Sequence, residues 1–279
     1  MRTRIHGFRA VAVLPFTLAA LIAIGATGCG SSGSSSSTVV AGASGTTGAS
    51  GSTSGAGPSA SVLAPIHGKY SPKIDPANFV KTVDNPYWPL KPGTAYLFEG
   101  VRGTTPQTDD ETVTDRTKAI LGIPATAVLD VVSEHGKPVE RTVDYYAQDK
   151  WGNVWYMGED SFETNSQGKM VRASDSWLAG VKGGQPGIIM PANPKPGDAY
   201  RQEYYPPGQA LDEARVLSLN GSTTVPYHGK HTGLLVTSER SPLEPQTEQK
   251  YYSPGLGEVM EKVVKGHHEA FQLVGVTHP

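Results

Sequence analysis

The sequence predicts an all-β fold: a curved antiparallel sheet or half-barrel of about 10–11 strands, built from two tandem five-stranded meander repeats. Three observations predict it. From Asn85 onward, short β-type segments alternate with turns rich in Gly and Pro, and helical periodicity is poor. A hairpin pattern at Asp144–Glu159 (DYYAQDKWGNVWYMGE) returns about a hundred residues later at Lys250–Glu261 (KYYSPGLGEVME). A flat sheet of this width would leave long exposed edges, which predicts curvature.

The first repeat unit is predicted at about residues 86–160. Its expected strands are Thr94–Gly100, Thr112–Leu121, Ala125–Glu134, Val139–Gln148 and Val154–Gly158. Alternation with a period of two is clearest in Val139–Gln148, where Val139, Val143, Tyr145 and Ala147 face one way and Glu140, Thr142, Asp144, Tyr146 and Gln148 face the other. One face of this strand is therefore predicted to be packed and the other to be wet, as in an antiparallel sheet.

The second repeat unit is predicted at about residues 190–265. Lys195-Pro196-Gly197 repeats Lys91-Pro92-Gly93, and Tyr251-Tyr252 repeats Tyr145-Tyr146. The expected strands are Asp198–Tyr205, Leu211–Leu219, Thr232–Glu239, Thr247–Tyr252 and Glu258–Val264, with Ala270–Val276 as a closing strand. Nearly constant spacing between matched blocks predicts a duplication. The alternative is that unrelated meanders reuse Pro-Gly turns and Tyr-rich strands.

The N-terminal residues 1–28 have the pattern of an export signal. A basic start is followed by the apolar run Val11–Ala26, which is short and contains Pro15. The small residues that end it precede Cys29, the one cysteine of the chain, and this junction resembles the lipobox of bacterial lipoproteins. The resemblance implies that Cys29 is lipidated. An ordinary secretory signal with an incidental cysteine is the alternative.

Residues 29–61 are predicted to be the lipidated cysteine and a disordered linker of Ser, Gly, Thr and Ala, because such a chain cannot bury enough apolar surface to fold. Residues 62–279 are predicted to be a single β-rich domain. This domain has 21 Lys and Arg (24 less Arg2, Arg4 and Arg9) against 26 Asp and Glu, a net charge of −5. A mildly acidic domain argues against nucleic acid as a partner.

No motif for a nucleophile, a phosphate loop, a zinc site or a dinucleotide is present, so no catalytic residue, no metal site and no cofactor is predicted. His228 with His231, and the pair His267-His268, are expected to be solvated turn residues. Asp144, Asp149, Glu159 and Asp160 cluster around the first hairpin, and paired carboxylates could serve a hydrolase if a cleft held Asp144, Asp149 or Glu159 near a histidine. Asp149 is more simply explained as a turn residue.

The candidate ligand-binding residues are three tryptophans and one apolar segment: Trp151, Trp155, Trp177, Ile188, Ile189 and Met190. Trp151 lies in the turn of the first hairpin, where it could contact a ligand or cover the end of the core. Ile188, Ile189 and Met190 are predicted to lie in a loop rich in Gly and Pro and must be buried somewhere. They could plug the concave face of the sheet, or form a lid over a cavity for an apolar ligand.

Several blocks of the chain resemble a group of exported bacterial proteins without an assigned activity. These blocks are NPYWPLKPGT, DYYAQDKWGNVWYMGED, GIIMPANPKPGDAYRQEYY and KYYSPGLGEV, within Asn85–Val264. The predicted plan of an anchored, curved sheet is also loosely similar to envelope lipoproteins of the LolA and LppX type, and implies a carrier or binding role.

The sequence therefore predicts an extracytoplasmic lipoprotein, anchored at the outer face of the cell membrane or in an outer membrane, with no enzymatic activity. Its domain would bind an apolar or envelope-derived ligand, or a partner. The alternatives are an extracytoplasmic hydrolase that uses the carboxylates of the 144–160 hairpin, and a structural or interaction module. No oligomeric state is predicted.

Overall fold

The computed structural model describes residues 57–279 of the 279-residue chain. The predicted signal segment 1–28, Cys29 and residues 30–56 of the predicted linker lie outside the described residues. Within the described part, no helix is both long and apolar enough to cross a membrane.

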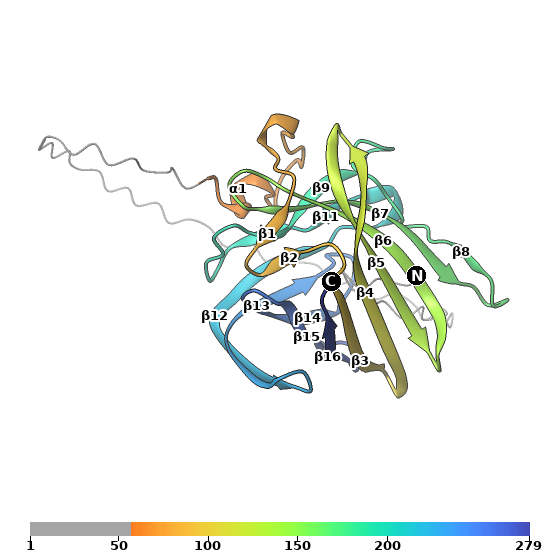
Figure 1. The fold of residues 1–279 in the computed structure, drawn as a ribbon. Helices are drawn as coiled ribbons and strands as arrows, with labels where there is room; N and C mark the ends of the chain where they lie inside the picture. Colours follow the sequence, from red (N-terminus) through yellow and green to blue (C-terminus); the bar gives the residue numbers. More distant parts are fainter. Residues whose placement is uncertain (1–56) are drawn as a thin grey trace, which may run out of the picture.

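Two antiparallel meanders make up most of the domain (Figure 1). The first contains β3 (Ala95–Arg102), β4 (Thr105–Ile120), β5 (Ile123–Glu134), β6 (Lys137–Gln148), β7 (Val154–Thr164) and β9 (Gln185–Met190). The second contains β10 (Ala199–Arg201), β12 (Glu213–Val225), β13 (Gly229–Arg240), β14 (Thr247–Ser253), β15 (Gly257–Lys265) and β16 (Glu269–Thr277). Pairing of β16 with β3 joins the meanders into one sheet.

The predicted all-β fold with a large, curved antiparallel sheet is confirmed (Figure 1). The described residues hold more strands than predicted, 14 in the main sheet, because several are only two or three residues long and show no periodicity. The short elements are α1 (Ala60–Leu63), η1 (Pro76–Asn78), β1 (Val83–Asn85), β2 (Trp88–Leu90), β8 (Met170–Arg172), β11 (Glu203–Tyr204) and η2 (Pro206–Gly208).

The two meanders share local geometry at the positions that the sequence comparison matches. The Gly93 N–H donates to the Val113 carbonyl at 2.8 Å, and the Gly197 N–H donates to the Val216 carbonyl at 2.9 Å. Both glycines have a positive φ, +87° and +96°. These correspondences agree with a duplication, which itself stays a prediction.

The Tyr-Tyr pairs supply a second correspondence. The pairing of β6 with β7 shifts register between Tyr145 and Tyr146, and the pairing of β14 with β15 shifts between Tyr251 and Tyr252. The residue before each pair is therefore structurally equivalent, although it is Asp144 in one meander and Lys250 in the other. This difference reverses the charge at one interior position.

The ends of the sheet meet without joining into a continuous barrel. β10 pairs with β12 at one end of the sheet, and β11 pairs with β9 at the other. Only Gln202 separates β10 from β11 in the chain, and its backbone N–H donates to the Asp212 carbonyl at 2.7 Å. A single interrupted segment, 199–204, thus bridges the two edges, which limits the exposed length of each.

Two features of the sequence prediction are corrected by the structure. The segment Ile188–Met190 is not a loop but part of β9, which pairs with β7 and β11. The expected wet face of Val139–Gln148 is also wrong, because its polar side chains are all buried, whereas Val139 and Val143 are only half-buried. The polar face of β6 points to the inside of the curved sheet, where ion pairs and hydrogen bonds compensate for its burial.

The segment that precedes β3 packs against the sheet interior. The Tyr70 hydroxyl donates to the Pro186 carbonyl at 2.6 Å. The β1–β2 hairpin carries Trp88, whose ring lies 5.4 Å from that of Tyr146 and 6.0 Å from that of Tyr252, between centroids. One side chain thereby contacts both Tyr-Tyr pairs and connects the meanders through the core.

Candidate functional site

Asp149 organises the turn of the first hairpin. Its carboxylate accepts hydrogen bonds from the backbone N–H groups of Trp151 and Asn153, from the Asn153 amide and from the Trp155 indole, all at 2.9–3.0 Å. All of these donors come from the same hairpin, and Asp149 is buried. The structural interpretation of Asp149 as a turn residue accounts for these contacts.

Trp151 lies where the N-terminal segment reaches the domain. The Gly57 backbone lies against its ring, and a Cβ added at Gly57 would lie 2.3 Å from the ring atom Cγ. The Lys150 ammonium lies over the same ring, 4.8 Å from its centroid. These contacts give Trp151 a role in seating the start of the domain.

The other predicted ligand residues lie in the core. Trp155, Trp177, Ile188, Ile189 and Met190 are each at most 3% exposed. The Trp177 indole donates to the Glu203 carboxylate at 2.8 Å. Burial of Trp155 in β7, of Ile188–Met190 in β9 and of Trp177 in the connection before β9 favours the plug interpretation over the lid.

Asp144 and Glu159 are cross-strand partners, and both are buried. Asp144 accepts a hydrogen bond from the Tyr156 hydroxyl at 2.6 Å. Asp149 lies at the far end of the hairpin and faces its own turn. The structure therefore brings together two of the three carboxylates on which the hydrolase alternative depends.

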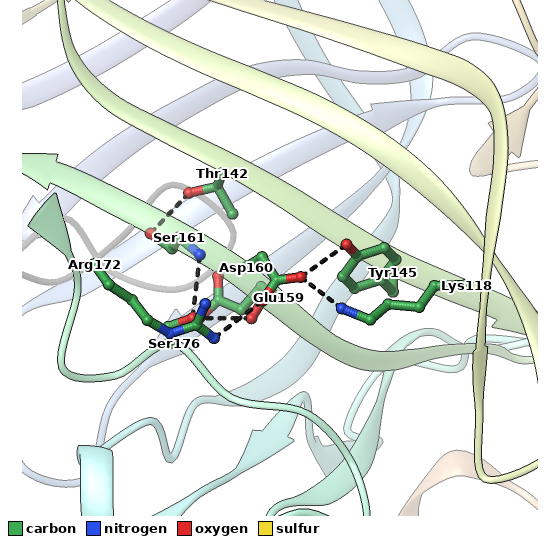
Figure 2. Close-up of polar contacts among 8 residues, drawn as sticks. All are labelled: Lys118, Thr142, Tyr145, Glu159, Asp160, Ser161, Arg172 and Ser176. Carbon is green, nitrogen blue, oxygen red and sulfur yellow. Dashed lines mark hydrogen bonds and ion pairs between the residues drawn. The ribbon is translucent and has the colours of Figure 1, made fainter. Parts of the chain in front are cut away.

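Asp160 is the centre of a separate polar group, shown in Figure 2. Its carboxylate accepts hydrogen bonds from Lys118 at 2.6 Å, Tyr145 at 2.9 Å and Arg172 at 3.0 Å. Partial burial opposes the charge of Asp160, but these three donors outweigh it and lower the pKa of the carboxyl group. Arg172 and Lys118 are substantially exposed, so this group has the character of a surface ion-pair network.

Three of the four histidines considered lie in connections between strands, as expected, but His231 is half-buried within β13. His228 is exposed at the turn between β12 and β13, and His231 Nε2 lies 2.8 Å from the Tyr227 carbonyl oxygen. His267 and His268 are exposed between β15 and β16.

The most unusual feature of the interior is a group of carboxyls around one buried lysine, which we call the acidic cluster. Its members are Asp109, Glu111, Asp130, Asp144, Glu239, Glu248, Glu258, Glu261 and Lys250. They come from β4, β5 and β6 of the first meander and from β13, β14 and β15 of the second. The two meanders therefore contribute to one electrostatic site.

Lys250 is the cation of this cluster. Its side chain is 2% exposed, and its Nζ lies 2.9 Å from a Glu261 oxygen, 3.7 Å from Glu258 and 4.0 Å from Glu239. Burial alone would lower the pKa of Lys250, but the surrounding carboxylates outweigh it and raise the pKa well above its usual value. Lys250 therefore remains charged.

The pKa values of the cluster's carboxyls are also raised, which favours their neutral form. Burial raises the pKa of Glu258 to about 8, against the lowering effect of Lys250 and with further raising by Glu261. Burial and neighbouring carboxylates also raise the pKa values of Glu111 and Asp130 well above their usual range. Near neutral pH, the cluster thus holds protons that solvated carboxyls would have lost.

A pocket opens onto the acidic cluster, and we call it the seam pocket. Its cavity volume is about 30 Å³. Its lining is Trp88, Pro89 and Leu90 of the β1–β2 hairpin region, Tyr96, Phe98, Glu111, Val113, Val128 and Tyr146 of the first meander, and Leu256, Gly257 and Glu258 of the second. Glu111 and Glu258 are its charged residues. Mostly apolar walls with a few converging polar groups are typical of a ligand site.

Three carboxyls of the cluster are spaced as metal ligands could be. One oxygen from each of Asp109, Glu111 and Asp130 lies within 4.8 Å of the other two. Carboxylate oxygens suit Ca²⁺ and Mg²⁺, although either ion needs about six ligands in all.

Sequence analysis did not identify this site. The available signal was the spacing of two between Asp109 and Glu111 and between Glu248 and Lys250, which places each pair on one face of a strand. That spacing does not indicate whether the shared face points to the inside of the sheet or to solvent.

No protein-family model matches the chain, and no curated protein matches it. Two solved structures resemble it. One is a candidate exported protein with a YmcC-like fold from Bacteroides fragilis, with 9% identity and a TM-score of 0.38. The other is a candidate lipoprotein from Parabacteroides distasonis, with 11% identity and a TM-score of 0.35. Each match covers 69% of this chain and 99% of the other.

Proposed function

We propose that this protein is an exported lipoprotein, held at the outer face of a membrane by an acylated Cys29, whose domain binds an apolar ligand without chemical transformation. The signal-like segment 1–28 and the small residues before Cys29 support the placement. Stable anchoring takes two acyl signals, and a processed bacterial lipoprotein has at least two chains.

The seam pocket is the observation that carries the binding role. It is lined by apolar and aromatic side chains from both meanders, whereas Ile188, Ile189 and Met190 are covered. The ligand site is therefore assigned to the pocket around Trp88 and Leu256 instead of the residues that the sequence favoured. The geometry supports the hydrolase alternative less well than a binding role, because the Asp149 carboxylate is hydrogen-bonded within its own turn.

Replacing Cys29 with Ala is expected to release the protein from the membrane, because the acyl chains supply the attachment. Most of the full-length chain should move from the membrane fraction to the medium or to the soluble envelope fraction. Immunoblotting of the fractions measures this, and intact mass shows whether the wild-type cysteine carries lipid. An unmodified cysteine in a released wild-type protein would refute the placement.

Replacing Leu256 with Trp is expected to reduce binding at the seam pocket at least tenfold, because the indole would fill a cavity of about 30 Å³. The full-length protein, purified from envelopes, is analysed by native mass spectrometry and organic extraction for a bound compound. Leu217→Trp, at a side chain that is 41% exposed, is the matched control. Binding in this pocket would be contradicted if the wild-type extract contained no ligand. It would also be contradicted if Leu256→Trp and Leu217→Trp retained equal amounts of ligand.

A further inference from the structure

Among the described residues, the acidic cluster contains many more carboxyls than cations. Eight carboxyls of the described residues interact with one another and with Lys250. In the second meander, Lys250 is buried on the same face of β14 as Glu248 and contacts three of the carboxyls. In the first meander, the equivalent position before the Tyr-Tyr pair is Asp144, which adds a carboxyl where the other half has an ammonium.

Two carboxyls of this cluster line the seam pocket, where a ligand can contact them. Glu111 is the carboxyl of the first meander that lines the pocket, and Glu258 is the carboxyl of the second meander that does so. Glu258 is 13% exposed at its side chain and lies 3.7 Å from Lys250. A positive group at this wall would therefore interact with both halves of the cluster in a region of low dielectric, where charges act strongly.

The rest of the wall favours an organic cation over a metal ion. Trp88, Tyr96, Phe98 and Tyr146 in its lining are aromatic, and aromatic rings attract ammonium groups, whereas Leu256 is aliphatic. Metal ions such as Ca²⁺ prefer six to eight oxygen ligands, and these walls are mainly carbon. A cavity of about 30 Å³ holds about two water molecules, which is close to the size of an ammonium group with its first carbon.

We infer that the seam pocket binds a primary ammonium carried on an apolar body, with the ammonium between Glu111 and Glu258 and the body against Trp88 and Leu256. This inference rests on the proposed binding function and names its ligand class. At this position the ammonium adds to the effect of Lys250, which already favours the ionised forms of Glu111 and Glu258. The source of such a group can be a free amine or the headgroup of an aminolipid.

Calorimetric titration of the full-length protein tests the charge requirement. Benzylamine, benzyl alcohol and benzoate share a ring and differ in charge. Benzylamine is expected to bind at least tenfold more tightly than benzyl alcohol, and benzoate is expected not to bind. A short-chain phosphatidylethanolamine in a parallel titration distinguishes the two sources, since binding of either compound supports the ammonium chemistry and the tighter one names the source.

Two substitutions locate the binding. Glu258→Gln removes a carboxyl that can ionise beside the ammonium, with little change of shape, and should weaken benzylamine binding at least tenfold. Asp110→Asn is the matched control, because Asp110 neighbours Glu111 on β4 but is exposed on the opposite face, and it should leave binding unchanged. Circular dichroism confirms that each variant is folded. The titration of the three benzyl compounds into wild-type protein tests the charge requirement even if a variant does not fold.

The outcomes separate this inference from the function on which it rests. Equal binding of benzylamine and benzyl alcohol would overturn the ammonium assignment and leave an apolar binding site. Binding of Ca²⁺ or Mg²⁺ without binding of benzylamine would overturn it in favour of the Asp109, Glu111 and Asp130 group. Absence of binding by every probe, together with no extracted ligand, would overturn both.

Discussion

Replacing Lys250 with methionine is expected to lower the free energy of unfolding by about 3–5 kcal/mol at pH 8, the usual cost of removing one partner of a buried ion pair. Methionine keeps most of the length of the lysine side chain, so the loss is mainly electrostatic. Lys250 is 2% exposed and lies within 4.0 Å of Glu239, Glu258 and Glu261. Without it, those carboxyls must be buried next to one another or take up protons.

Urea unfolding of wild type and variant at pH 8 and pH 5.5 measures this effect and its cause. At pH 5.5 the carboxyls protonate more easily, so the difference between the two proteins should shrink. Lys137→Met, at an exposed position of β6, is the control and should change stability by less than about 0.5 kcal/mol. Equal destabilisation at both pH values would contradict the electrostatic explanation, and a variant that folds only at the lower pH would support it.

The hairpins were predictable because their signals are local. The Tyr-Tyr pairs, the glycine at each turn and the alternation with a period of two all fall within about 15 residues of one another. These signals predicted the strands around Tyr146 and Tyr252 and the general plan of a curved sheet. The same local character explains the error in Ile188–Met190, since a run of three apolar residues does not distinguish a buried strand from a loop.

The interior was not predictable because it depends on distant pairings. The alternation in β6 places Asp144 and Tyr145 on opposite faces of the strand, but it does not indicate which of the two faces the curved sheet encloses. The expectation that the polar side faces water failed because Lys250, about a hundred residues away, lies inside with the carboxyls. Buried polar groups of this kind need their partners, and those partners come from six strands in two meanders.

The pocket follows from the same long-range arrangement. Glu111 and Glu258 are separated by 147 residues in the sequence (258 less 111) and meet only because the meanders face one another. Trp88, which sequence analysis did not select, closes the pocket, whereas Trp155 and Trp177 are core residues. The tryptophan content of the sequence therefore did not indicate which indole lines a pocket.

The stability of the protein is expected to rise as the pH falls from 8 to 6, the reverse of ordinary acid unfolding. The pKa of Glu258 is raised from 4.5 to about 8 in the folded state, and those of Glu111, Asp130, Asp212 and Glu248 are raised as well. A carboxyl with a raised folded pKa binds more protons when folded than when unfolded. Stability then falls as pH rises between the unfolded and folded pKa values.

The expected size follows from this proton difference. Each proton that the folded state holds in excess changes the free energy of unfolding by about 1.4 kcal/mol per pH unit. One such proton gives about 2–3 kcal/mol between pH 8 and pH 6, or a rise in Tm of about 5–10 °C for a domain of this size. Asp160 acts in the opposite direction, because its lowered pKa contributes stability that is lost only as pH falls below its usual titration range.

Thermal unfolding of the full-length protein followed by circular dichroism from pH 5 to pH 8.5 measures this dependence. Glu258→Gln should be more stable than wild type at pH 8 and should show a smaller slope, because it removes a group that must be charged or protonated in the interior. Asp110→Asn, on the exposed face of β4, should keep the wild-type slope. A Tm that is constant or rises with pH in this range would mean that the carboxyls of the acidic cluster are ionised in the folded state, with enough cation beside them to balance their charge.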